Sequence, residues 1–257
     1  MVEINKIPKG IHMPKFFVDK SQIQDGFVTL RGNDASHISY SLRMAKGEHI
    51  SVCDGEEQEY DCVLVDFQGD CVTAEIVAMR VSDNESPVRV YLYQALPKGD
   101  KLESVIQKAV ECGVYEIIPF ESERCVVRAK AEAEDKKQIR RNRIAEEAAK
   151  QCGRGRIPTV EKTVSFKEAI RKAAEAELCL ICYEDEKGTT LKQVLEAADT
   201  TPSSISIMIG SEGGFAASEV KAAVELGLRP VSLGRRILRT ETAPVFVLSN
   251  ISYKFEL

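Results

Sequence analysis

The chain has 257 residues, of which 44% are hydrophobic and 29% charged, and its formal net charge is −5 at pH 7. These proportions are typical of a globular protein with a buried core, and the length allows one large domain or two smaller ones. The negative net charge argues against a protein that coats nucleic acid indiscriminately. No apolar run approaches the ~18 residues of a membrane span and no export signal is recognised, so we expect no membrane partner and a cytoplasmic location.

Residues 1–12 show no hydrophobic periodicity, and we expect them to be an N-terminal extension. Short strand-like runs then alternate with glycine-containing turns, which predicts a small β-barrel domain over residues 13–82. One helix is expected among them, beginning at Asn33 or Asp34, either of which could cap it, and ending at Met44. The expected strands are 15–19, 27–30, 49–53, 59–66 and 71–79.

The polar stretch 82–87 is expected to connect this domain to a second one, residues 88–257. Strand-like and helical runs alternate beyond it, which predicts an α/β fold with a parallel sheet covered by helices on both faces. Strands are expected at 88–96, 114–119, 178–183, 205–209 and 230–233. Helices are expected at 101–112, 130–152, 166–176 and 191–198, before Leu226, and at 240–255, where Pro244 falls in a first turn that needs few backbone donors.

Eight cysteines are scattered along apolar patterns without a repeated spacing. In a chain without an export signal we expect them to be buried, reduced thiols. Cys179 and Cys182 are three positions apart in an expected strand, so their side chains should point to opposite faces and not share a metal or a disulfide. The chain has only three histidines, none near a cysteine pair, and we expect no metal site.

Glycine-containing loops follow the strands expected at 205–209 and 230–233. The first loop has three glycines, beginning with Gly210, and the second combines three arginines with Glu241 and apolar neighbours. Loops at the carboxyl ends of parallel strands are where ligands bind, so the two loops predict a single pocket. The glycines of the first loop fit neither a dinucleotide fingerprint nor a phosphate-binding loop. The alternative is that both loops are ordinary turns that precede helices.

Two segments carry a family resemblance: Ile-Gly-Ser-Glu-Gly-Gly-Phe from Ile209, and Leu-Gly-Arg-Arg-Ile-Leu-Arg-Thr-Glu-Thr-Ala from Leu233. In this order and at this separation they resemble the paired signature of the small-subunit ribosomal RNA methyltransferase E family, in the SPOUT superfamily. The segment 37–47 resembles the signature of that family's first domain. One departure is Ser211, where many relatives carry proline.

The resemblance implies a SPOUT-type parallel sheet with a trefoil knot, an exception to the rule that connections do not thread loops, preceded by a PUA-like RNA-binding barrel. It also implies a homodimer that uses S-adenosylmethionine to methylate N3 of a uridine in 16S ribosomal RNA, either free or in the small ribosomal subunit. The alternatives are another SPOUT activity, such as ribose 2′-O or guanine methylation, and a non-catalytic RNA-binding protein.

Arg239 and Glu241 are the expected catalytic residues, because uridine N3 must lose a proton while negative charge spreads onto the flanking oxygens. Arg239 could hold the uracil oxygens or a phosphate, and Glu241 could accept the proton or orient Arg239 through an ion pair. If the segment is strand-like, alternation places both side chains on one side. The alternative for Glu241 is a helix-dipole partner, and Glu212 is a weaker candidate for the base.

The cofactor is expected to lie against both loops, with backbone groups hydrogen-bonding it and Ile237 and Leu238 packing its ring. In the resembled family the pocket also draws on the end of the preceding strand, near Tyr183. The expected cofactor-binding residues are Tyr183, Ile209, Gly210, Gly213, Leu233, Gly234, Ile237, Leu238 and Thr242.

A basic segment between residues 136 and 156 has eight lysines and arginines against two acidic residues. Such a concentration in an acidic chain predicts a localised site for RNA phosphates, although a solvated helix face with ion pairs to Glu146 and Glu147 is the alternative. For Arg43, which lies in the segment that resembles the first domain of the family, the alternative is an ordinary helix surface. The expected RNA-binding residues are Arg43, Arg140, Arg141, Arg143, Arg154 and Arg156.

Overall fold

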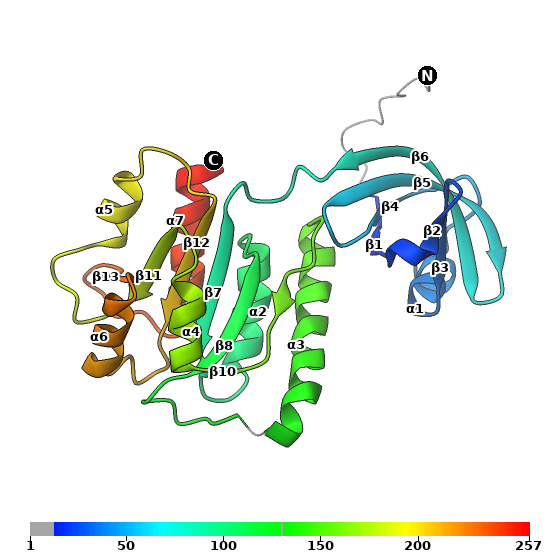
Figure 1. Cartoon of the computed structure of the whole chain (residues 1–257). Coiled ribbons are helices and arrows are strands. Elements are labelled where there is room, and N and C mark those ends of the chain that lie inside the picture. Colours follow the sequence, from blue (N-terminus) through cyan, green and yellow to red (C-terminus); the bar gives the residue numbers. More distant parts are fainter. Residues whose placement is uncertain (1–12, 130) are drawn as a thin grey trace. The chain divides into compact units, whose positions relative to one another are not determined.

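The computed structural model of the chain describes residues 13–129 and 131–257, which form two compact units (Figure 1). The first unit contains the described residues up to Glu85 and the segment Ala149–Ile157, and the second contains Ser86–Ala148 and Pro158–Leu257. The segment 149–157, which the sequence analysis places in the C-terminal domain, thus groups with the N-terminal unit. The expected extension at residues 1–12 lies outside the described residues.

The first unit is built on a six-stranded sheet in the order β1-β4-β5-β6-β3-β2. Its ladders are antiparallel except for the parallel pair β1 and β4. Register shifts between Asp61 and Cys62 and between Leu64 and Asp66 interrupt the long β5–β6 ladder, and such irregularities bend a sheet. The strands are β1 (Lys15–Phe17), β2 (Ile23–Gln24), β3 (Phe27–Arg31), β4 (His49–Cys53), β5 (Gln58–Gln68) and β6 (Cys71–Val81).

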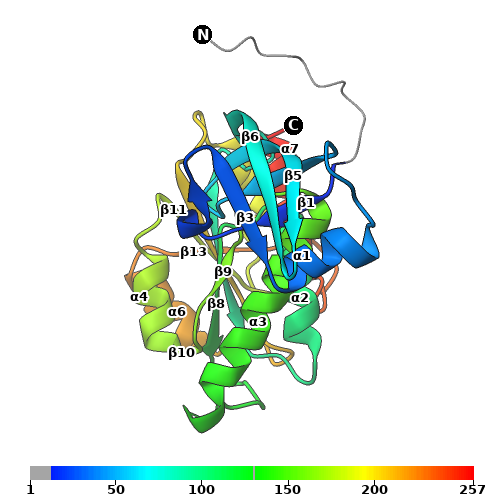
Figure 2. The ribbon, with the colours of Figure 1, turned by 90° about the vertical axis from the view of Figure 1, so that its right-hand side faces the viewer.

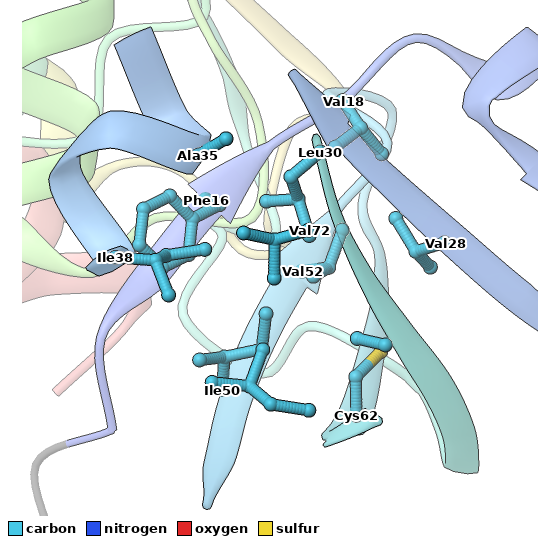
Figure 3. Close-up of a cluster of buried hydrophobic side chains, with 12 residues drawn as sticks. Phe16, Val18, Val28, Leu30, Ala35, Ile38, Ile50, Val52, Cys62 and Val72 are labelled. Carbon is cyan, nitrogen blue, oxygen red and sulfur yellow. The ribbon is translucent and has the colours of Figure 1, made fainter. Parts of the chain in front are cut away.

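Alternating apolar residues of this sheet form the core of the first unit. Val28 and Leu30 of β3 and Ile50 and Val52 of β4 are completely buried, as period-2 alternation requires. Figure 3 shows them gathered with side chains from β1, β5, β6 and the helical segment, including Ile38. The five strands expected from sequence are all present, whereas the two-residue β2 was too short to give a pattern.

The helix expected from Asn33 or Asp34 to Met44 is shorter and less regular. A four-residue helix α1 (Asn33–Ser36) passes into a π-helical segment η2 (His37–Ser41). Its N-cap is Gly32, at φ 59°, without a side-chain cap hydrogen bond, so the predicted capping role of Asn33 or Asp34 is wrong. The helix ends early because Arg43 adopts φ 54°, a left-handed conformation that cannot continue a right-handed helix.

The second unit contains a seven-stranded sheet in which every ladder is parallel. The strand order is β10-β8-β7-β12-β11-β13, with β9 paired to β8. The strands are β7 (Arg89–Ala95), β8 (Glu116–Glu121), β9 (Thr159–Val160), β10 (Val164–Ser165), β11 (Leu178–Cys182), β12 (Ser204–Ile209) and β13 (Arg229–Val231). The five longer ones match the expected strands.

Helices cover both faces of this sheet. Helices α4 and α6 lie on one face and α2 and α3 on the other (Figure 2), while α7 packs against α2 and α5. The α/β architecture with a parallel sheet predicted from the sequence is therefore confirmed. The helices are α2 (Lys101–Glu111), α3 (Ala131–Cys152), α4 (Phe166–Ala173), α5 (Leu191–Glu196), α6 (Ala217–Glu225) and α7 (Ala243–Phe255). Pro244 lies in the first turn of α7.

All eight cysteines are reduced thiols. Cys53, Cys62 and Cys125 are buried as expected, but Cys152 is exposed and the other four are half-buried, which corrects the expectation for those five residues. Burial raises the pKa of Cys53 and of Cys62 to about 12, because the apolar surroundings disfavour the thiolate. Over residues 13–129 and 131–257, none of the helices has the length and apolar character needed to span a bilayer.

Candidate active site

The two glycine-containing loops lie at the carboxyl edge of the parallel sheet. Residues 210–216 connect β12 to α6, and residues 232–242 connect β13 to α7. Thr240 of the second loop donates a hydrogen bond to the Gly210 carbonyl at 2.7 Å and accepts one from Gln94 Nε2 at 3.0 Å. Gln94 is on β7 and completely buried, so the second loop is anchored to the middle of the sheet.

To make this contact, the second loop must cross the carboxyl edge of the sheet from β13 to β7. Strand β13 is the last strand in the order, whereas β12 and β7 are central and β11 lies between. The chain therefore leaves the edge strand and returns over the carboxyl ends of β11 and β12 to reach Thr240. The two loops, 30 positions apart at their contact, meet over the centre of the sheet, where parallel folds bind ligands.

The glycines of the first loop are needed for close packing within the protein. A Cβ atom on Gly210 would lie 3.1 Å from Gly214 Cα, and one on Gly213 would lie 2.9 Å from Arg124 Cβ. Gly214 has φ 65°, and its amide donates to the Ser211 carbonyl at 3.0 Å. Glycine is required here because backbone and side chains from neighbouring segments approach closely.

Gly234 of the second loop is different. It adopts φ 112°, and a Cβ atom there would have no heavy atom of the described chain within 4 Å. The Ile237 side chain nearby is 88% exposed, which is unusual for an isoleucine, while Leu233 and Leu238 are half-buried. The surface of this loop therefore offers both open space and exposed apolar area.

Arg239 and Glu241 lie just before α7. Thr240 begins a turn that leads into α7, so the strand-like alternation considered for these two residues is absent. The Arg239 carbonyl accepts hydrogen bonds from the amides of Thr242 and Ala243, which fixes the backbone at the start of the helix. Its side chain is exposed and forms no ion pair within the described part of the chain.

Glu241 pairs with Lys101 instead of Arg239. Its Oε2 atom lies 3.4 Å from Lys101 Nζ, so an ion pair that orients Arg239 is not formed. Lys101 also donates to Glu212 Oε1 at 2.9 Å. Burial opposes ionisation of Glu212, but hydrogen bonds from Lys101 and from the Lys98 amide lower its pKa below the ordinary value. One ammonium group thus connects the carboxylates of the two loops.

The end of β11 borders the same loops. The Tyr183 amide donates to the Val231 carbonyl, and the Ser232 amide donates to the Thr189 carbonyl, so the segments that follow β11 and β13 run together. Tyr183 is half-buried. The structure thus brings the expected cofactor-binding residues of three strand ends, from Tyr183, Ile209 and Leu233 onward, to one edge of the sheet.

The basic segment does not form the open array of charges expected from the sequence. Arg141 is 7% exposed and donates to Glu134 Oε1 at 2.8 Å. Arg154 is 4% exposed and pairs with Glu85 at 2.5 Å. A guanidinium buried in an ion pair cannot reach a phosphate, so these two residues are removed from the expected RNA contacts.

The other expected RNA-binding residues are more accessible. Arg140 and Arg143 are exposed on α3, where they pair with Glu103 and Glu147 at the surface. Arg156 is half-buried and Arg43 is exposed, in the first unit. Arg140 and Arg143 remain the strongest candidates for phosphate contacts on α3.

The chain is similar in sequence to known proteins over most of its length. A family model described as an RNA methyltransferase domain matches residues 84–252. A ribosomal RNA small subunit methyltransferase E from Bacillus subtilis (strain 168) is 35% identical over 251 residues, which cover 95% of this chain and 98% of that protein. The chain belongs to the ribosomal RNA small subunit methyltransferase E family.

Other members of the methyltransferase E family give the same result. The protein from Synechocystis sp. (strain ATCC 27184 / PCC 6803 / Kazusa) is 32% identical, over 94% of this chain and 78% of that one. The crystal structure of the Neisseria gonorrhoeae member, bound to S-adenosyl methionine, superposes with a TM-score of 0.81. It is 32% identical, with 94% of this chain and 98% of that chain covered.

Lys101, Arg124 and Gln94 contact the two loops of this methyltransferase but were not among the site residues expected from its sequence. Lys101 follows the carboxyl end of β7, and Arg124, whose Nη1 donates to the Gly213 carbonyl at 3.1 Å, follows that of β8. Their position after parallel strands was a usable signal, since such loops converge at one edge. Gln94 lies inside a strand, where no pattern distinguishes a buried glutamine that binds a loop.

Proposed function

We propose that this protein transfers a methyl group from S-adenosylmethionine to N3 of a uridine in 16S ribosomal RNA. The observation that carries the proposal is the contact between Thr240 and the Gly210 carbonyl, which joins the two loops of the family signature over the carboxyl edge of the sheet. The relative from Neisseria gonorrhoeae, which is bound to S-adenosyl methionine, supports the choice of cofactor.

The residues at this edge fit such a cofactor. Side-chain oxygens of Gln94 and Ser211 are buried without a hydrogen-bond partner in the described chain, and polar ligand groups could satisfy them. The space beside Gly234 and the exposed Ile237 suit an aromatic ring. S-adenosylmethionine supplies an activated methyl group, so the work of the protein is to align donor and acceptor and to exclude water.

In the proposed reaction Glu241 accepts the proton from uridine N3, and the exposed Arg239 guanidinium stabilises the charge that spreads onto the flanking oxygens. The two residues are separated only by Thr240, whose hydrogen bonds fix it to Gln94 and Gly210. Arg239 has its side chain available for the acceptor because Glu241 pairs with Lys101.

Further parts of the proposal concern the whole chain. The return of residues 232–242 over the ends of β11 and β12 supports a trefoil knot, and the six-stranded first unit supports a PUA-like barrel that binds RNA. Exposed Arg43, Arg140 and Arg143 are the proposed phosphate contacts. We further propose that the protein acts as a homodimer in the cytoplasm.

Purified protein incubated with methyl-labelled S-adenosylmethionine and small-subunit RNA, free or in assembled subunits, tests this function. We expect labelled 3-methyluridine after digestion of the RNA to nucleosides. A 2′-O-methylated nucleoside or a methylated guanine would identify another activity of the same pocket. RNA binding without cofactor binding would show that the protein is a non-catalytic RNA-binding protein.

A further inference from the structure

Lys101, the first residue of α2, lies between carboxylates from two different loops. Its Nζ atom donates to Glu212 Oε1 at 2.9 Å and lies 3.4 Å from Glu241 Oε2. Glu212 is in the loop after β12, and Glu241 is in the loop after β13. Lys101 and Glu212 are 111 positions apart in the sequence, so this convergence exists only in the folded sheet.

The surroundings make the ammonium group important for both carboxylates. Glu241 Oε2 is buried and has no hydrogen-bond partner among the described residues, so the charge of Lys101 is its principal compensation. Glu212 receives one further hydrogen bond, from the Lys98 amide at 3.2 Å. Without the ammonium group of Lys101, the carboxylates of Glu212 and Glu241 would repel each other. Each would also lose an ion-pair partner while it is partly shielded from water.

The electrostatics of Lys101 agree with a persistent contact. Its hydrogen bond to Glu212 raises the pKa of Lys101 above the ordinary value, and the interaction with Glu241 adds to this effect. The side chain of Lys101 is 32% exposed, and those of Glu212 and Glu241 are 25% and 28% exposed. The three groups are thus less hydrated than the surface ion pairs of α3, such as Arg143 with Glu147.

We propose that Lys101 is a positioning residue that holds Glu212 and Glu241 together, so that the glycine loop and the Arg239–Glu241 segment keep one relative geometry. The proposal rests on the proposed function in so far as Glu241 is the proton acceptor. Lys101 acts through the two carboxylates. It fixes the loop after β13, which carries Arg239 and Glu241, to the loop after β12, which carries Glu212.

The first test needs no activity. Amide exchange of the peptides that contain Gly214 and Thr242, whose amides are hydrogen-bonded within their loops, is measured by mass spectrometry in wild type and in Lys101→Met. We expect exchange in both peptides to accelerate by about threefold or more, because each loop loses its ion pair with Lys101 and opens more often. Lys101→Arg retains the positive charge and should preserve protection.

Lys108→Met is the matched control, because Lys108 is exposed on the same helix and makes no ion pair in the part of the chain described. It should leave exchange in both peptides unchanged. Unchanged exchange in Lys101→Met, or faster exchange in only one of the peptides, would overturn the proposal. Should Lys101→Met not fold, Lys101→Gln carries the same comparison.

The second test connects the contact to the reaction. Single-turnover methyl transfer is compared in Lys101→Met, Glu241→Gln and the double variant at saturating cofactor. We expect Lys101→Met alone to lower the rate by about tenfold, and to lower it by less than about twofold further when Glu241 is already replaced, since residues that act as a unit are not additive. Losses that multiply fully would show that Lys101 does not act through Glu241.

The two tests separate the possible failures. A wild-type protein that transfers no methyl group would refute the proposed function, while the exchange measurement would still decide whether Lys101 connects the loops. Normal wild-type methylation with an unaltered rate in Lys101→Met would refute the positioning role alone.

Discussion

At the scale of single residues, Gly210 and Gly234 are both in the proposed cofactor site but differ in their surroundings. Gly234→Val has open space for its side chain, so we expect cofactor binding to be lost by steric exclusion, with a stability loss of ~1–3 kcal/mol because valine is strained at a φ of 112°. Gly210→Val should also lose binding and stability, but for another reason: its Cβ meets Gly214. Calorimetric titration and thermal unfolding measure the two effects. Wild-type affinity in both variants would remove the glycines from the site.

Arg239 is predicted to act on the acceptor and not on the cofactor. Arg239→Lys keeps the charge but loses the planar guanidinium, so we expect methyl transfer to slow by about tenfold or more with cofactor affinity little changed. Single-turnover kinetics and calorimetry separate the two quantities. If affinity collapses while the saturated complex keeps its rate, Arg239 belongs to the cofactor site.

At the scale of elements, Glu134 forms a buried ion pair with Arg141 within α3, and its hydrogen bonds from Thr163 fix this helix to the segment that contains Thr163. Glu134 Oε1 accepts from Arg141 and from the Thr163 amide and hydroxyl. Glu134→Gln leaves a buried guanidinium uncompensated and should reduce the free energy of unfolding by ~3 kcal/mol. The control Glu147→Gln breaks only an exposed pair of the same helix and should cost less than about 0.5 kcal/mol. Urea unfolding at pH 7 checks both; equal losses would contradict the distinction.

The same pair predicts a pH dependence. Although burial opposes it, hydrogen bonds from Thr163 and the charge of Arg141 lower the pKa of Glu134 below its ordinary 4.5. A carboxyl whose pKa is lowered by folding contributes stability above its unfolded pKa and loses it as the pH falls through the folded pKa. Stability should therefore decline below about pH 4.5 less steeply in Glu134→Gln than in wild type. Parallel declines in acid unfolding experiments would show that Glu134 does not contribute.

At the scale of the whole molecule, affinity for RNA should depend on salt through a few accessible arginines of an acidic chain. Replacing Arg140 and Arg143 with alanine should flatten the logarithmic salt dependence of RNA binding by about two contact units. Replacing Lys167 and Lys192, exposed elsewhere in the second unit, removes the same charge and should leave the slope nearly unchanged. Filter binding at several salt concentrations measures the slopes. An unchanged slope in the arginine variant would shift RNA binding to the first unit.

Local signals were sufficient for most elements of the fold. Strands such as β4 and helices such as α2 follow from apolar periodicity and flanking glycines, because these depend on neighbouring residues. The early end of the helical segment after α1 was not expected from the sequence. It depends on the left-handed backbone conformation of Arg43, which local periodicity does not indicate. Strands β9 and β10 are each two residues long, too short to show a period. They form because both pair with the edge of β8 that β7 does not occupy.

For this protein the sequence alone determined the α/β class, the succession of its longer strands and helices, and the two loops of the family signature, because each is encoded by contiguous residues. Only the tertiary structure decided which charged side chains are accessible to RNA and which are paired within the protein. It buried Arg141 and Arg154 against Glu134 and Glu85, and it placed Lys101 between the two loops. The reason is that burial and ion pairing depend on distances between residues remote in sequence, and composition or spacing does not specify those distances.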